Sequence, residues 1–129
     1  MNYHITKTVS SDFDQAISDV TEALAAVGFG VLTTIDVRET MKKKIDVDFR
    51  PYVILGTCNP HLAHKALLAE DKVGTLLPCN VVVQERDDGV VEVSAMNPMA
   101  GLSMMGNPDV TAVGEDATER LTRMLDTLS

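Results

Sequence analysis

The chain has 129 residues, a mass of 14.0 kDa and a formal net charge of −8. Hydrophobic residues make up 45% and charged residues 23%, which is typical of a folded globular protein and excludes disordered and collagen-like classes. The acidic charge argues against nucleic acid or an anionic membrane as a partner. We expect one domain over residues 1–129, located in the cytoplasm, because neither a leader peptide nor an apolar run of the ~18 residues that a membrane helix needs is found.

Hydrophobic spacing predicts two long helices. In the first, apolar residues recur at steps of three and four from Phe13 to Val27, and Gly28 is placed to end the helix. Ser11 is expected to cap its start. The second helix begins near Asp109 and carries an apolar stripe that ends at Leu128.

Alternating or continuous apolar runs predict five strands, at residues 3–9, 30–37, 52–57, 76–83 and 90–96. Shorter helices are expected at 39–45 and at 60–70. The segment 97–108, rich in Gly, Pro and Met, is expected to be a loop with at most one helical turn. This order of elements predicts an α+β fold, a two-layer sandwich of about five mostly antiparallel strands with two long helices on one face plus shorter helices.

The first chemical constellation surrounds Cys58. This residue directly precedes Asn59 and Pro60, a pair typical of a helix start, and a helix N-terminus is expected to stabilise a thiolate. His64 follows in the first turns of that helix, and a second Cys-Asn pair, Cys79-Asn80, lies on the next predicted strand.

Two thiols and an imidazole suit zinc or a softer metal, so Cys58, His64 and Cys79 are candidate metal ligands. The same two thiols would also suit a redox dithiol. Buried, inert cysteines are the alternative. Parallel strands would keep the two sulfurs apart, whereas antiparallel strands would bring them together, and the sequence leaves both arrangements open.

Other polar residues form weaker candidates. Asp36, Asn59 and Asn80 are candidate ligand-binding groups beside the cysteines. Lys42, Lys44 and Arg50 belong to a basic segment that would bind a phosphate or carboxylate, or would simply face solvent. The methionines of segment 96–105 favour core filling or a self-association surface over copper binding.

Several motifs along the chain form a recognisable set: Lys7-Thr8-Val9, the run from Gly28 to Thr33, Ile35-Asp36-Val37, the run from Tyr52 to Gly56, Cys58-Asn59-Pro60, Ala63-His64, the run from Leu76 to Val81, and Arg120-Leu121. Together they resemble the bacterial and archaeal family called domain of unknown function 302. The resemblance spans nearly the whole chain. It implies a compact two-layer α+β domain and a homodimer, and it implies no activity, because the family has no established function.

Three functions are compatible with these residues. The first is a metal- or small-ligand-binding protein with a Cys/His site at the start of helix 60–70. The second is a thiol-based redox or transfer enzyme that uses Cys58. The third is a non-enzymatic homodimeric module that associates through segment 96–108 and the last helix.

Overall fold

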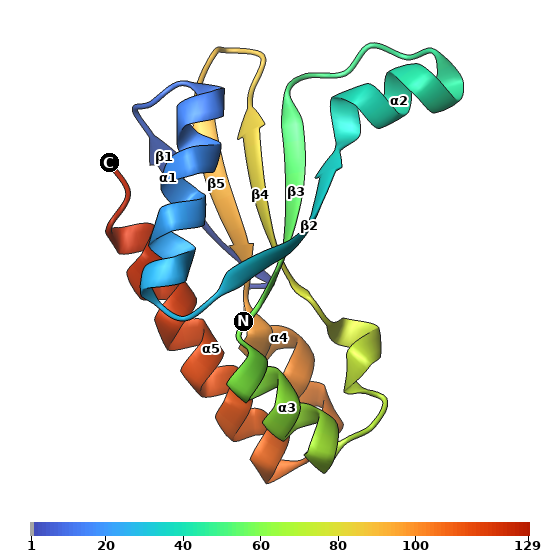
Figure 1. Ribbon diagram of the computed structural model, residues 1–129, viewed down its shortest axis with the longest axis vertical. Coiled ribbons are helices and arrows are strands. Elements are labelled where there is room, and N and C mark those ends of the chain that lie inside the picture. Colours follow the sequence, from blue (N-terminus) through green and yellow to red (C-terminus); the bar gives the residue numbers. More distant parts are fainter. Residues whose placement is uncertain (1) are drawn as a thin grey trace.

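The computed structural model describes residues 2–129, whose strands form one five-stranded sheet (Figure 1). The strands are β1 (His4–Val9), β2 (Gly30–Asp36), β3 (Tyr52–Cys58), β4 (Cys79–Glu85) and β5 (Val91–Met96). Their spatial order is β1-β5-β4-β3-β2, and every neighbouring pair is antiparallel. The helices are α1 (Phe13–Ala26), α2 (Val37–Ile45), α3 (Pro60–Ala69), α4 (Pro98–Leu102) and α5 (Pro108–Asp126), with short 3-10 turns at Val73–Leu76 and Ser103–Met105.

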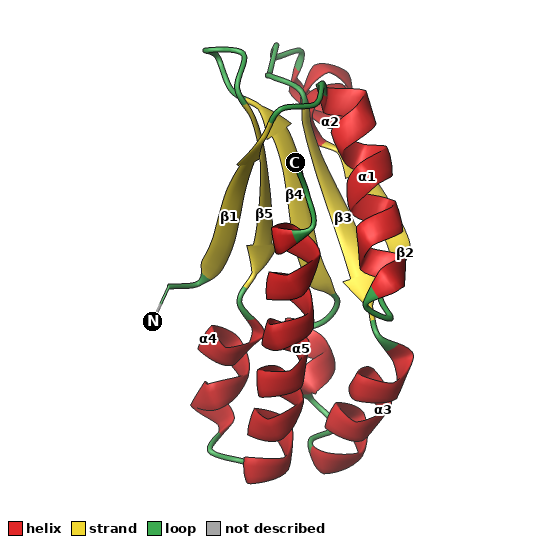
Figure 2. Ribbon diagram, turned by 90° about the vertical axis from the view of Figure 1, so that its left-hand side faces the viewer, coloured by secondary structure: helices red, strands yellow, loops and turns green. Residues whose placement is uncertain are grey.

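The two long helices lie on the same face of the sheet, as Figure 2 shows. Most inward residues of the strands are β-branched or aliphatic, and they pack against the apolar stripes of α1 and α5 to form one core. This arrangement confirms the predicted α+β class and the two helices on one face. No helix of residues 2–129 has both the length and the apolar character to cross a membrane.

The ends of α1 follow from its sequence. Asp12, not Ser11 as expected, is the N-cap, and its side chain accepts a hydrogen bond from the backbone N–H of Gln15 at 2.8 Å. At the other end Gly28 takes a left-handed conformation with φ of 86°, and the N–H of Phe29 returns to the carbonyl of Leu24. The predicted glycine end of this helix is therefore confirmed.

The segment 97–108 is more ordered than the expected loop. It forms α4 and a 3-10 turn, with Leu102 buried. A Cβ atom placed on Gly114 of α5 would lie 3.3 Å from the sulfur of Met99, so this segment packs closely on the last helix. Met104, in contrast, is 76% exposed. Most of the segment therefore fills space beside α5.

The helices α3, α4 and the first half of α5 gather beyond one end of the sheet (Figure 2). β3 ends there at Cys58 and continues into α3, while β4 begins there at Cys79. The predicted start of the fourth strand at residue 76 is wrong, because Val73–Leu76 forms a 3-10 turn and Pro78 precedes the first paired residue. This end of the sheet positions the two cysteines.

Candidate functional site

The register of β3 and β4 brings the two cysteines together. Thr57 lies directly opposite Cys79 in the antiparallel pair, so Cys58 is one residue beyond that pair on β3, and strand alternation starts its side chain on the opposite face from that of Cys79. A strand spacing of about 4.8 Å and a rise of about 3.4 Å per residue place the two Cα atoms roughly 6 Å apart. The antiparallel alternative left open by the sequence is the correct one.

Both cysteines line the same small cavity, where the end of the sheet meets the helices. Its volume is ≈ 30 Å³, which holds one or two water molecules, whereas ligand pockets measure roughly 300–1,000 Å³. The wall is otherwise almost entirely apolar. The lining residues are Phe29, Thr57, Cys58, Asn59, Leu62, Ala63, Ala66, Leu77, Pro78, Cys79, Pro98, Leu102, Val113 and Ala117.

Both thiols have raised pKa values, which is the opposite of the thiolate stabilisation expected for Cys58. Both cysteines are unbonded thiols, with Cys58 half-buried and Cys79 buried. Burial raises the pKa of Cys58, and burial together with the charge of a neighbouring Cys58 thiolate raises the pKa of Cys79 from 9.0 to about 11. The expectation that the helix start lowers the pKa of Cys58 is therefore not met, because burial of the thiol raises it.

Asn59 orders the chain next to Cys58. It is 7% exposed and caps α3, since its side-chain oxygen accepts a hydrogen bond from the N–H of Leu62 at 3.1 Å. A Cβ atom on Gly28 would lie 2.9 Å from Nδ2 of Asn59 and 3.2 Å from Nη1 of Arg120. The predicted helix start is confirmed, and the neighbouring backbone leaves this amide little room to move.

The structure separates the remaining ligand candidates from the cysteines. His64 is exposed on α3 and does not line the cavity, and Asn80 is exposed on β4. Asp36 is the exposed N-cap of α2, where it accepts a hydrogen bond from the N–H of Glu39 at 3.0 Å. Across residues 2–129, no group of three or more His, Cys, Asp or Glu side chains is arranged to hold a metal ion. The predicted set of Cys58, His64 and Cys79 is therefore not assembled around one point.

The basic residues are likewise divided between two places. Lys42 and Lys44 lie on α2, where Lys42 pairs with Asp46 at 2.9 Å and with Asp48 at 3.5 Å. Arg50 instead donates a hydrogen bond to Gln84 at 2.9 Å, and its guanidinium lies 4.5 Å from the centre of the Phe49 ring.

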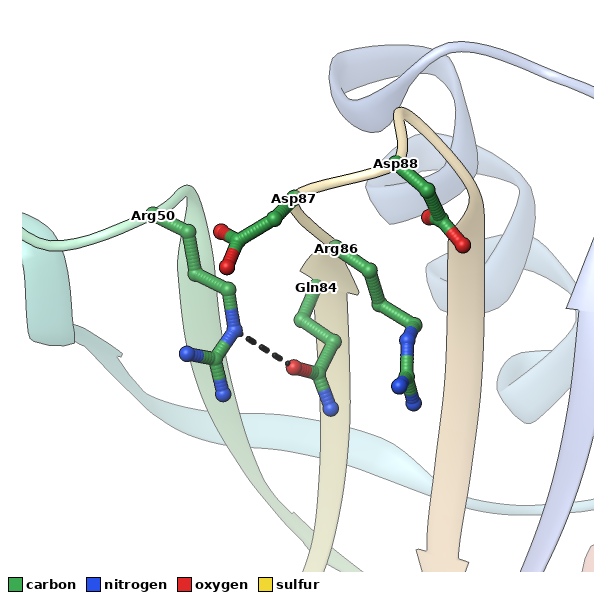
Figure 3. Close-up of a pocket in the computed structure, with 5 residues that line it drawn as sticks. All are labelled: Arg50, Gln84, Arg86, Asp87 and Asp88. Carbon is green, nitrogen blue, oxygen red and sulfur yellow. Dashed lines mark hydrogen bonds between the residues drawn. The ribbon is translucent and has the colours of Figure 1, made fainter.

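Figure 3 shows the pocket beside Arg50, which is lined by Arg50, Gln84, Arg86, Asp87 and Asp88. Two guanidinium groups are balanced there by two carboxylates, so the pocket has no net positive charge to attract an anion. Lys42 and Lys44 are not part of its lining. The predicted anion site of Lys42, Lys44 and Arg50 is therefore not formed as one site.

One polar residue of the cavity, Thr57, was missed in the sequence. It is fully buried, and its hydroxyl donates a hydrogen bond to the carbonyl oxygen of Cys79 at 2.8 Å. This bond fixes the backbone of Cys79 against β3. The sequence feature that could have indicated Thr57 is a single hydroxyl residue at the end of an otherwise apolar strand, next to a cysteine.

These elements define the class of the protein. It is a small α+β domain whose antiparallel sheet is covered by helices on one face, with two cysteines where the end of the sheet meets three helices. The family model described as "Domain of unknown function DUF302" matches residues 5–128, so the chain belongs to the DUF302 family. The resemblance stated from the motifs is confirmed.

One solved structure is similar over its whole length. It is described as the crystal structure of an uncharacterized conserved protein DUF302 from Bacillus stearothermophilus, and it shares 33% identity with a TM-score of 0.92. The similarity covers 100% of both chains. A search of the curated proteins found no match.

Proposed function

We propose that this protein is a thiol–disulfide redox protein in which Cys58 and Cys79 form a reversible intramolecular disulfide. The observation that carries the proposal is that Cys58 and Cys79 line one small cavity, with Cys58 one residue beyond the Thr57–Cys79 pair in the β3–β4 register. A Cα separation of roughly 6 Å lies in the range for disulfides, and the bond also requires both side chains to turn toward the shared cavity at this end of the sheet. The cavity is too small for an organic ligand, but a bond between its two sulfurs needs no additional volume.

The exposures of the two thiols assign their roles. Cys58 is half-buried and meets the oxidant first, whereas Cys79 is buried and meets only Cys58. The Cys58 thiolate attacks a low-molecular-weight disulfide, forms a mixed disulfide and releases one thiolate. The Cys79 thiolate then attacks the Cys58 sulfur and releases the second. Two protein thiols are oxidised, one small disulfide is reduced to two thiols, and the two protein protons pass to those products.

The raised pKa values set the character of this chemistry. A thiol whose pKa is raised is mostly protonated near neutral pH and attacks slowly. The pair therefore suits a slow response to sustained oxidation, in which the disulfide persists once it has formed, rather than rapid catalytic turnover. In a reducing compartment the resting form is the dithiol.

Oxidised glutathione and mass spectrometry test the proposal. After incubation at pH 9 we expect the wild-type protein to lose both free thiols with no glutathione attached. Cys79→Ser should accumulate one glutathione on Cys58, because the second step is blocked. Cys58→Ser should react slowly or not at all, since its remaining thiol is buried.

Two results would refute the proposal. One is wild-type protein that stops at the mixed disulfide, as Cys79→Ser does. The other is wild-type protein that keeps both free thiols while a small thiol control in the same tube is fully oxidised. Circular dichroism of the single-cysteine variants shows whether each is folded.

A further inference from the structure

The segment that runs from β2 into α2, residues 30–47, forms one edge of the sheet and is joined to the rest of the fold mainly through the pairing of β2 with β3. We call it the β2–α2 arm. Every side chain of α2 is exposed or half-buried, and six of the seven residues of β2 are exposed. In Figure 1, α2 extends outward beyond the β2 edge of the sheet. A helix of nine residues is marginal in water unless its side chains pack against other elements. Because α2 has no buried residue, it lacks most of that stabilisation.

The two edge strands of the sheet, β1 and β2, differ in how they are protected from pairing with another chain. The β1 edge carries Lys7 on its inward side, and that ammonium donates a hydrogen bond to the carbonyl of Leu128. An inward-pointing charge of this kind protects an edge strand from pairing with another chain. β2, with the sequence Gly-Val-Leu-Thr-Thr-Ile-Asp, has no lysine or proline. Its only irregularity is a bulge between Val31 and Thr33, which leaves the remaining four residues regular.

The arm also carries an unusual share of exposed apolar surface. Leu32 is 66% exposed and Ile45 is 62% exposed, and Ile35 and Val47 are both above 40%. These are four of the nine exposed large hydrophobic side chains among residues 2–129, in a stretch of 16 residues. Such clustering marks an interaction surface.

The charge of α2 indicates what covers the surface. With Arg38, Glu39 and three lysines, α2 has a net charge of +3, which Asp36 and Asp46 at its two ends reduce to +1 for the whole β2–α2 arm. The helix next to β2 is α1, whose charged residues are Asp14, Asp19 and Glu22, and these give it a charge of −3. An acidic group that complements α2 is therefore present on the chain itself: Glu22 lies in the half of α1 that leads into β2, whereas Asp14 and Asp19 lie in its first half.

We propose that the β2–α2 arm is the interface with a second copy of this chain, in which the two β2 strands pair antiparallel about a twofold axis. The pairing continues the sheet from one protomer into its partner and covers Leu32 and Ile35. Because the strands run in opposite directions, the α2 helix of each protomer lies beside the start of β2 in the other. That end of β2 directly follows α1, whose last turn contains no basic residue to balance the helix dipole.

Light scattering on reduced protein tests the interface. We expect the wild-type protein to have twice the 14.0 kDa chain mass and Ile35→Lys to weaken association at least tenfold. Leu68→Lys is the matched control, because Leu68 is 76% exposed on α3, and it should remain dimeric. Met104→Glu should also remain dimeric, which separates this interface from one built on segment 96–108.

Disulfide crosslinking provides a second measurement that does not depend on how Ile35→Lys folds. In a Cys58→Ser, Cys79→Ser background, cysteine is placed at Thr33, Thr34 or Ile35 in turn, and at Thr8 of β1 as the control. We expect at least one β2 variant to form an interchain disulfide on mild oxidation, and the β1 control to form none.

The proposal is overturned if the wild-type protein has the mass of one chain at every concentration up to about 1 mM. It is also overturned if Ile35→Lys folds and remains fully dimeric, or if the β1 position crosslinks in preference to all three β2 positions.

Discussion

At the residue scale, the decisive property of the site is how strongly each thiol holds its proton. Cys79 is buried beside Cys58, and its pKa of about 11 exceeds the ordinary value of 9.0. A folded state that holds this proton more tightly than the unfolded state loses stability as the pH rises above the unfolded pKa. The stabilising effect is complete below pH 9 and disappears between about pH 9 and 11.

We therefore expect the free energy of unfolding to fall by on the order of 2 kcal/mol between pH 9 and 11. Urea unfolding of the reduced protein at several pH values measures this change. Cys79→Ser has no thiol to titrate there, so its stability should vary less over the same range. An equally steep decline in Cys79→Ser would assign the effect to other groups.

A second residue-scale prediction concerns the cap of α3. Asn59→Ala removes the acceptor for the N–H of Leu62 in a buried position, and we expect a loss of about 1–2 kcal/mol. Asp36→Ala removes the corresponding cap of α2, which is exposed to solvent, and should cost less than Asn59→Ala. Thermal unfolding of both variants compares the two caps, and an equal loss would show that burial does not add to the cost.

At the element scale, β2 and β3 meet closely where β2 is bulged. A Cβ atom on Gly56 would lie 2.2 Å from Oγ1 of Thr33 and 3.1 Å from Cγ of Pro78. Gly56→Ala should therefore destabilise the protein by roughly 1–3 kcal/mol, because both neighbours must shift. Gly74→Ala is the control, since no heavy atom lies within 4 Å of its added Cβ, and it should change stability by less than about 0.5 kcal/mol. Urea unfolding measures both, and equal stabilities would contradict this packing argument.

The same scale shows what the sequence could predict. The apolar stripes of α1 and α5 could be predicted from the sequence because apolar side chains at steps of three and four face one core. The helix in segment 97–108 had a signal that was not used: Asn97-Pro98 and Asn107-Pro108 repeat the Asn59-Pro60 pair, and all three cap helices. The helical pattern of this segment could not be predicted from hydrophobic spacing, because α4 and the following 3-10 turn are short and rich in Gly and Met.

The site itself depended on information that one strand does not contain. The position of Cys58 before a helix is local and was correctly predicted, but its neighbour is set by the β3–β4 register. Burial raises the pKa of Cys58, and the cavity that this residue lines is closed in part by Leu102 and Val113, which follow much later in the chain. Local sequence therefore identified the two cysteines, and tertiary packing reversed the expected direction of the pKa of Cys58.

At the scale of the whole molecule, charge acts on folding and on association in opposite ways. The chain has a net charge of −8, and the adjacent helices α1 and α5 are both acidic, so the folded monomer contains like charges at close range. The proposed dimer instead places the basic α2 of one protomer beside the C-terminal half of α1 in its partner, which carries Glu22. Salt screens both interactions between exposed charges.

We therefore expect added sodium chloride to stabilise the monomer and to weaken the dimer. Between about 0.02 and 0.5 M salt, the unfolding temperature of the monomeric Ile35→Lys variant should rise by a few degrees. Over the same range the dissociation constant of the wild-type dimer should increase several-fold, as sedimentation measures it. Replacing Lys42, Lys43 and Lys44 with Gln should remove most of that salt dependence, because the attraction it reports would then be absent. A dissociation constant that stays flat or falls with salt would show that association rests on the apolar contacts of Leu32 and Ile35 without help from α2.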